Sequence, residues 1–383
     1  MMKKKVLFSL TALTMMSLAA CNQIGEPASQ EGTGTLVIEL RGAPSTKAGT
    51  DAAGNEETLK DTQIFIFNTD SGESLYRKET VTGADKTLSV THMKAGTYTV
   101  ATLSNYQALN ASASGGGALN PKTRKELEDV AVNLGMCDPQ NCFLLYGVTA
   151  SPVTVRSDSG TEASSSASAA KADVTLRRFA SRVRLVEVEN ELPEAYGALK
   201  VDHVFLENGY GSWTIGAAAD PTGPVNWGGR KEGKASSATE GDFIQAQGDA
   251  QYPAQTFRDC GTSVARGADK AEKFNYLFYT FPNPAQQNQD NFSGPLAGTG
   301  AACVRLVVRA TFEGGNGRSF YYPVTILGAG DKPLARNTSY DVRMTIRGEG
   351  VSDPNEEPKY GNLNVEIAIA PWDDGGEVIN KEF

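Results

Sequence analysis

The chain has 383 residues, enough for two domains of ordinary size, and apolar residues make up 40% of it, so a packed core is expected. Its formal net charge of -9 argues against nucleic acid as a partner, because phosphate binding needs a basic face. Only two histidines are present, His92 and His203, and the sequence contains no nucleophile elbow, zinc-protease helix or phosphate-binding glycine loop. We therefore expect no enzyme, no cofactor and no metal site.

The chain begins with the three parts of an export signal: a basic start at Lys3–Lys5, an apolar stretch from Val6 to Met16, and small residues before Cys21. The apolar stretch is too short to cross a bilayer core of roughly 30 Å as a helix. The Leu-Ala-Ala-Cys ending resembles the lipobox of bacterial lipoproteins. That resemblance implies a signal peptide over residues 1–20 and lipidation of Cys21; the alternative is an ordinary secretory signal with a chance cysteine.

Short strand patterns fill the first half of the mature chain. Thr35–Leu40 is the first predicted strand, and it lies between two small, polar segments, residues 22–34 and 41–61. Further strands are predicted at residues 63–68, 86–90, 96–103, 143–146 and 153–155. The best helix candidate runs from Pro121 to Val130, with Asn120 as N-cap. This spacing predicts a β-sandwich over residues 48–172, in which 157–172 form a loop or interdomain linker.

A second domain is predicted over residues 173–383. It opens at Ala172–Leu185, and apolar and polar residues alternate from Arg182 to Val188 as in a half-buried strand. Strands are also predicted at residues 200–206, 275–281, 304–312, 319–326 and 340–346. Gly314–Gly317 is expected to form a hairpin turn. Residues 209–270 are rich in Gly, Ala, Asp and Gln and are expected to form long surface loops.

Two strands are predicted at the end of the chain. Four aliphatic side chains fall on one face of the first strand: Leu363, Val365, Ile367 and Ile369. Pro371 interrupts the ladder, and Asp373–Gly376 form a flexible joint after Trp372. The second strand runs from Glu377 to the last residue and carries three apolar residues: Val378, Ile379 and Phe383.

Four cysteines remain after Cys21. Cys137 and Cys142 flank a turn-rich spacer, so a disulfide between them is possible in an exported protein, and a Cys260–Cys303 bridge is a second possibility. A Cys-x4-Cys spacing without a second pair or a nearby histidine is a poor signal for zinc.

Several of these features occur together in a known order. They are the lipobox at Cys21, the strand within Glu31–Ile38, Lys47 before a polar loop, and residues 63–68. Near the end, Leu334–Val342 carries an Arg-Asn-x-x-Tyr-Asp pattern, and residues 348–350 and then 363–372 follow. In this order, along essentially the whole chain, they resemble the major fimbrial subunits of type V pili, which are lipoprotein-derived pilins of Gram-negative anaerobes.

The resemblance implies an all-β fold with minor α content, made of two transthyretin-like β-sandwich domains in tandem. Residues 21–47 would be a propeptide with a removable first strand, and 363–383 would carry the donor strands. A trypsin-like protease would cut in the loop after the first strand, and a strand from another copy or a related pilin would fill the groove. The family is usually cut after an arginine. Lys47 matches best by position but is a lysine, and Arg41, directly after the strand, is the other option.

This interpretation predicts a lipid-anchored precursor in the outer membrane that becomes part of a cell-surface fimbrium supporting adhesion. The partners would be other pilins, the membrane and a processing protease, and the sequence does not identify a receptor. Two alternatives remain open: a monomeric glycan-binding or adhesive surface lipoprotein, and a tip or anchor subunit of a fimbria. A cuttable loop together with a terminal strand favours a stalk subunit.

Overall fold

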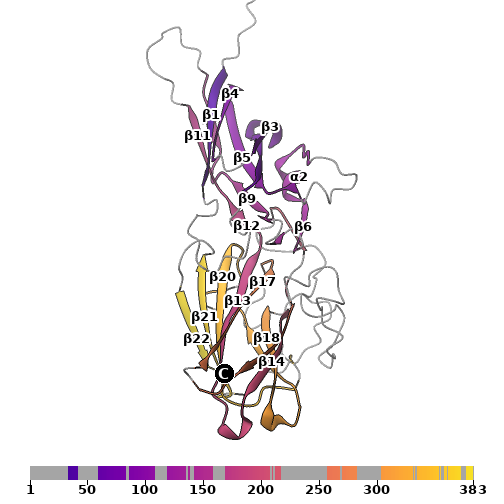
Figure 1. Cartoon of the computed structure of the whole chain (residues 1–383). Helices are drawn as coiled ribbons and strands as arrows, with labels where there is room; N and C mark the ends of the chain where they lie inside the picture. The colour runs from indigo at the N-terminus through magenta and orange to yellow at the C-terminus, as the bar shows by residue number, and fades with distance from the viewer. Residues whose placement is uncertain are drawn as a thin grey trace, which may run out of the picture.

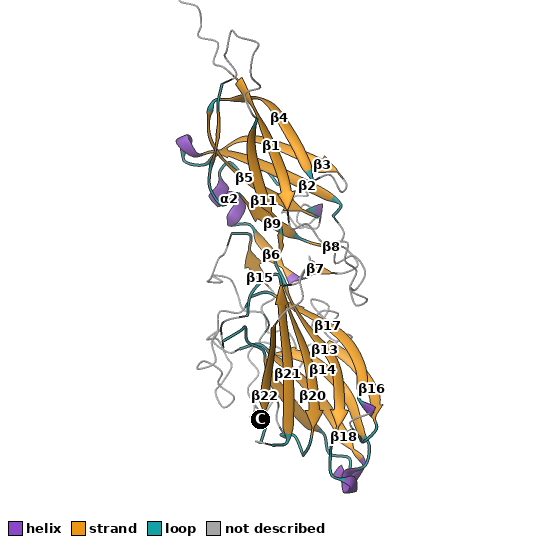
Figure 2. Cartoon of the chain, turned by 90° about the vertical axis from the view of Figure 1, so that its left-hand side faces the viewer, coloured by secondary structure: helices purple, strands orange, loops and turns teal. Residues whose placement is uncertain are grey.

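A computed structural model describes residues 33–41, 59–82, 86–107, 119–134, 137–138, 142–157, 169–207, 209, 212–216, 257–267, 270–282, 303–330, 332, 334–352, 354, 358–359, 361–371 and 377–382. These residues form two units of β-sheet that stack end to end in an elongated molecule (Figure 1, Figure 2). The predicted all-β sandwich class is confirmed, and the helical content is minor.

The first unit contains a three-stranded and a six-stranded sheet. In the smaller sheet, β1 (Thr33–Arg41) lies between β11 (Ala170–Thr175), to which it is parallel, and β4 (Thr87–Lys94), to which it is antiparallel. The larger sheet has the order β12-β9-β5-β2-β3, with β10 paired to β5. Its strands are β2 (Asp61–Asn68), β3 (Ser74–Thr82), β5 (Gly96–Ser104), β9 (Leu145–Val148), β10 (Val153–Val155) and β12 (Arg177–Arg178). Three short elements accompany it: η1 (Thr69–Ser71), α2 (Arg124–Glu128) and the β7–β8 pair (Cys137–Asp138, Cys142–Phe143).

The second unit is a sandwich of a five-stranded and a four-stranded sheet. The first has the order β17-β13-β20-β21-β22, and the second has the order β16-β14-β18-β19. The five strands are β13 (Ser181–Asn190), β17 (Glu272–Thr280), β20 (Thr338–Ile346), β21 (Leu363–Pro371) and β22 (Glu377–Glu382). The four are β14 (Leu199–Glu207), β16 (Phe257–Val264), β18 (Arg305–Phe312) and β19 (Phe320–Thr325), and the turns η3 (Glu194–Tyr196) and η7 (Glu313–Gly315) complete the unit.

Each unit has its own apolar core, built from strands that alternate between core and solvent and from strands, such as β2 and β5, that are buried at nearly every position. In β1 every second side chain is buried, and in β13 the buried positions include Val183, Leu185 and Val188. The core of the second unit is filled from both of its sheets, with Leu206 and Val308 from the smaller sheet and Val183 and Val342 from the larger. Alternating apolar residues thus indicate strands such as β1 and β13, whereas a continuous β-forming run indicates β2.

A third apolar cluster joins the two units, and it mixes first-unit residues such as Phe65 with second-unit residues such as Tyr279. Phe179, between β12 and β13, stacks on Tyr146 of β9 with the ring centroids 6.2 Å apart. The guanidinium of Arg336 lies 5.1 Å from the Phe179 ring centroid, and burial lowers the pKa of Arg336 to about 10, so it stays charged at neutral pH.

A strap from the second unit also crosses to the first. After β14 the chain forms β15 (Ser212–Thr214), which pairs with β6 (Ala131–Asn133) of the first unit. Trp213 and Ile215 of this strap are buried in the shared cluster. The two units are therefore joined by side-chain packing and by backbone pairing, and not only by one connecting segment.

Some elements differ from those predicted. The expected domain boundary between residues 172 and 173 falls inside β11, which pairs with β1, and the chain enters the second unit only at β13. The helix is shorter than expected, and its N-cap is Thr123 instead of Asn120, because the Thr123 hydroxyl accepts the backbone N–H of Glu126. Strand β16 lies within residues that were expected to be loops.

Candidate functional site

The candidate site is the place of β1 in the first unit. Leu36 and Ile38 are 0% exposed and Leu40 is 5% exposed, and all three pack into the aliphatic core of that unit. On the opposite side of this core lie residues of the larger sheet, among them Ile64 and Ile66 of β2. These three β1 side chains thus fill a trough between β4 and β11 whose floor is the larger sheet.

Both edges of β1 are bonded along nearly its whole length. It pairs with β11 from Leu36 to Arg41 and with β4 from Thr33 to Glu39. The Leu40 N–H donates to the carbonyl of Lys86 at 2.7 Å, and the Arg41 carbonyl accepts the N–H of Leu176 at 2.8 Å. Removal of β1 would leave two unpaired strand edges facing each other across an apolar trough, which is a template for another strand.

The solvent side of β1 carries a small charge ladder with β11. Lys171 Nζ lies 3.4 Å from Glu39 Oε1, and Arg41 Nη2 lies 2.8 Å from Asp173 Oδ1. The hydrogen bond from Lys171, with its charge and that of Arg41, lowers the pKa of Glu39. These pairs are exposed, so they set register more than they add stability.

The two predicted cut points lie at different places. Lys47 is outside the described residues. Arg41 is the last residue of β1, opposite Thr175 in the ladder, and its side chain is 60% exposed. A protease needs an extended, unpaired segment, so cutting after Arg41 requires the end of this ladder to open.

The C-terminal strands form an antiparallel hairpin at the edge of the second unit. β21 lies between β20 and β22, and among the strands that the structure describes β22 pairs only with β21. Leu363, Val365 and Ile367 are buried in the core, and Ile369 packs against it partly exposed. The predicted one-face pattern of β21 is therefore confirmed.

In the ladder, Ala368 and Ile367 of β21 face Val378 and Ile379 of β22. Trp372 and Phe383, like Cys21 and residues 1–20, the predicted signal peptide, lie outside the described residues.

Neither of the two cysteine bridges considered possible is present among the described residues. Cys142 is a free, buried thiol, and the β7–β8 ladder places it opposite Asp138 instead of Cys137. Cys260 packs against the core of the second unit, whereas Cys303 packs with Leu327 in a separate small cluster. The order β16-β14-β18 explains this separation, because β14 lies between the strand of Cys260 and the strand that follows Cys303.

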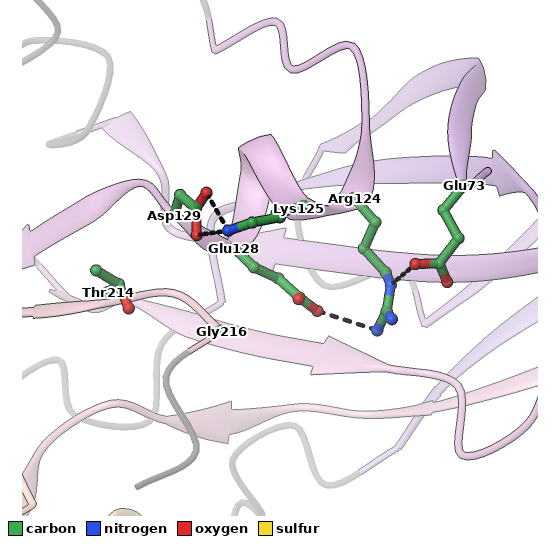
Figure 3. Close-up of a pocket in the computed structure, with 7 residues that line it drawn as sticks. All are labelled: Glu73, Arg124, Lys125, Glu128, Asp129, Thr214 and Gly216. Atoms are coloured by element: carbon green, nitrogen blue, oxygen red, sulfur yellow. Dashed lines mark hydrogen bonds and ion pairs between the residues drawn. The ribbon is translucent and has the colours of Figure 1, made fainter. Parts of the chain in front are cut away.

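A polar cavity of about 390 Å³ lies beside α2 (Figure 3). Its lining residues are Glu73, Arg124, Lys125, Glu128, Asp129, Thr214 and Gly216. Arg124 bridges Glu73 at 2.8 Å and Glu128 at 3.1 Å, and Lys125 pairs with Asp129 at 2.7 Å. The charges of this cavity thus satisfy one another. Within the described ranges there is no group of three or more acidic, His or Cys side chains suited to a metal ion.

The residues around β1 that sequence reasoning missed are those of β11. Its alternation over Ala170–Thr175 is present in the sequence, but the preceding run of Ser and Ala made the region look like a linker.

No helix among the described residues is long and apolar enough to cross a membrane.

Comparison with solved structures shows the same fold. A fimbrilin from Porphyromonas gingivalis is 14% identical, with a TM-score of 0.57 over 89% of this chain and 98% of that one. A protein from Bacteroides eggerthii assigned to cell adhesion is 18% identical, with a TM-score of 0.56 over 89% and 96% of the two chains. A third, from Parabacteroides distasonis and also assigned to cell adhesion, is 14% identical, with a TM-score of 0.51 over 89% and 99%.

No protein-family model matches the chain, and no curated protein sequence matches it. The likeness to fimbrial subunits predicted from the sequence is thus confirmed at the level of the fold.

Proposed function

We propose that the protein is a structural subunit of a cell-surface fimbria that polymerises by strand exchange. The observation that carries the proposal is the position of β1: it is the middle strand of its sheet, yet it comes first along the chain among the described strands. One cut after β1 therefore detaches it without breaking any other element. The fold shared with a fimbrilin and with proteins assigned to cell adhesion supports this class of function.

The vacated groove supplies the driving force for assembly. Each aliphatic side chain that is fully buried contributes roughly 1.5–3 kcal/mol, and each net ladder hydrogen bond contributes about 1 kcal/mol. For three side chains and two ladders the sum is on the order of 10 kcal/mol before ordering costs. A joint of this strength, made by strand addition, persists.

The C-terminal hairpin β21–β22 is the donor in this proposal. It lies in the second unit, whereas the groove lies in the first unit, so the two parts of the joint are in opposite halves of an elongated molecule (Figure 1). A contact between different surfaces of neighbouring copies is head-to-tail, and it generates a filament when the rotation between copies does not close a ring.

Export, lipidation and proteolytic cleavage precede assembly in this proposal. The precursor is exported, lipidated at Cys21 and held in the outer membrane, and a protease then removes β1 by cutting at Lys47 or Arg41. The receptor that the fimbria contacts is not part of the proposal. A monomeric adhesive lipoprotein would need neither the cut nor the exchange. A test of polymerisation after proteolysis therefore separates the two functions.

The test is mild trypsin treatment of the purified precursor, followed by electrophoresis in SDS without boiling and sequencing of the new N-terminus. We expect high-mass ladders whose subunits begin after Arg41 or Lys47. A protein that is cut but stays monomeric, with β1 still seated, would contradict the proposal.

A reversible lock makes this test sharper. Val37 and Ser89 are antiparallel partners on the solvent side of β1 and β4, so a Val37→Cys/Ser89→Cys pair fits a disulfide. The oxidised variant should be cut normally but form no ladders, and a reductant should restore them. The matched control is Lys200→Cys/Ser263→Cys between β14 and β16, which should polymerise with or without reductant.

A further inference from the structure

The groove of β1 is not uniform along its length, because one end is closed to side chains. Gly34 is buried and faces the end of β10. A Cβ atom at Gly34 would lie 2.8 Å from Cγ1 of Val155 and still closer to the carbonyl oxygen of Arg156. Backbone cannot move aside as a flexible side chain can, so only glycine fits this position without displacing β10.

The other positions of the groove also have defined requirements. Leu36, Ile38 and Leu40 fill three buried subsites. On the solvent side, Glu39 lies opposite Asp173 in the ladder and forms a diagonal ion pair with Lys171 at 3.4 Å, and this ion pair favours an acidic residue at that position. The groove therefore selects a strand with glycine first, aliphatic residues two, four and six positions later, and an acid before the last aliphatic residue.

One other described segment of the chain has this pattern. Gly361–Ile367 reads Gly-Asn-Leu-Asn-Val-Glu-Ile, and Gly34–Leu40 reads Gly-Thr-Leu-Val-Ile-Glu-Leu. Leu363, Val365 and Ile367 are the buried positions of β21, as Leu36, Ile38 and Leu40 are of β1. The acid also has the same kind of partner, because Glu366 pairs with Arg343 of the adjacent strand at 2.9 Å.

We infer that Gly34 marks a glycine-only subsite, and that the segment of a second copy that fills the groove is Gly361–Ile367, with Gly361 in that subsite. This inference rests on the proposed function and adds the register of the joint. Moving β21 by two residues would place Leu363 against Arg156. The β22 segment fits less well, since Gly376 in the subsite would put Asn380 and Glu382 in buried aliphatic positions.

Release of β21 from its own sheet is compatible with this register. The hairpin is attached beyond β20, whereas no strand is added beyond the equivalent strand β11 in the described part of the first unit, where Val174 forms a single isolated bridge with Thr149. The first unit thus forms a sandwich without any strands equivalent to the β21–β22 hairpin. The three aliphatic side chains that leave the second unit enter three subsites of the same kind.

Synthetic peptides test the inference without disturbing β21 in the protein, where Gly361 has a φ of +82° that a substitution would strain. The precursor is cut with trypsin, and fluorescent peptides in excess are followed by polarisation. Peptides 33–41 and 360–368 should bind. Gly34→Val and Gly361→Val should weaken their respective peptides at least about tenfold, the effect of overpacking a closed site. The matched changes Thr35→Val and Asn362→Val, on the other face, should not.

Three results would overturn the inference. Equal binding of the glycine and valine peptides would remove the subsite. Binding of peptide 375–383 but not of 360–368 would assign the groove to β22, and strand exchange itself would still stand. If even peptide 33–41 fails to exchange, the groove is not open to any strand, and the proposed function fails together with the inference.

Discussion

β1 and β13 hold the same place in their two units, but the proposed exchange removes only β1. β1 is parallel to β11 and antiparallel to β4. In the same way, β13 is parallel to β20 and antiparallel to β17. β13 is covalently continued on both sides by described elements, β12 and η3, whereas β1 has no element before it in the described chain. In the proposed exchange, this difference in chain connection is the reason that β1 and not β13 is the strand replaced.

Side-chain anchoring differs in the same direction. Arg184 of β13 forms a salt bridge and hydrogen bonds with Asp341, and these side chains are only 12% and 21% exposed. The corresponding pair of β1, Arg41 and Asp173, is 60% and 53% exposed. A partly buried pair is costly to break, while an exposed pair contributes little. The difference between the units thus lies in how firmly an equivalent strand is held.

The largest effect is expected from placing a charge beneath each of these strands. Leu185→Asp buries an unpaired carboxylate in the core of the second unit and should cost more than about 4 kcal/mol, so that this unit does not fold. Ile38→Asp has the same chemistry, but β1 can swing out and place the charge in water. We expect soluble protein with native-like circular dichroism for Ile38→Asp only.

Proteolysis gives the second measurement for this pair of variants. In Ile38→Asp, β1 should be removed by trypsin much faster than in the unaltered precursor, while the second unit stays resistant. If both variants lose the same structure, the two strands are equivalent and the comparison between them fails.

A smaller effect is expected at the junction of the units. Trp213 of the strap is 5% exposed, and truncation of a buried aromatic side chain typically costs about 3–5 kcal/mol. Trp213→Ala removes packing that belongs to both units, so thermal unfolding should separate into two transitions in calorimetry. Phe274→Ala, whose side chain packs only in the second unit, is the matched control and should lower stability without such a separation. A single transition in Trp213→Ala would show that the strap does not couple the units.

Sequence reasoning succeeded where burial alternates. The strand of Leu363, Val365 and Ile367 and the front strand were predicted because their apolar residues recur every second position. β16 was missed because Phe257–Val264 contains Gly261 at a φ of +66° and few apolar residues, so its pairing comes from neighbours and not from its own pattern. The spacing of Thr123 to Glu126 is typical of an N-cap, but Pro121 also favours a helix that begins earlier, and the earlier start was predicted.

The partners of the site could not be predicted from any single segment. The sequence shows that residues 35–40 form a strand, but not that β11, far along the chain, is its parallel neighbour. Pairing of distant strands depends on the whole arrangement, as does the position of Gly34 against Arg156. The removable strand is implied by the resemblance, and the structure adds that β1 is seated between β11 and β4.

The smallest effect is expected from the exposed charges of β1. The pKa of Glu39 is lowered by Lys171, so this interaction stabilises the seated strand above the ordinary glutamate value and is lost as pH falls through the lowered pKa. Glu39→Gln should therefore speed the release of β1 after a trypsin cut only slightly at neutral pH. In the unaltered protein, release should become faster below about pH 4 as Glu39 is protonated, and Glu39→Gln should lack this increase. Release is measured by mass spectrometry of the freed peptide over time.

Glu79→Gln, on β3 and paired with Arg77, is the matched control and should leave release unchanged. A large increase in release for Glu39→Gln would mean that surface charge, and not the three aliphatic side chains, holds β1 in place. Because those side chains are buried and the charges are exposed, we expect burial of the side chains to contribute most of the free energy that holds β1 in place. In the proposed exchange, an incoming strand must therefore fill the same three subsites.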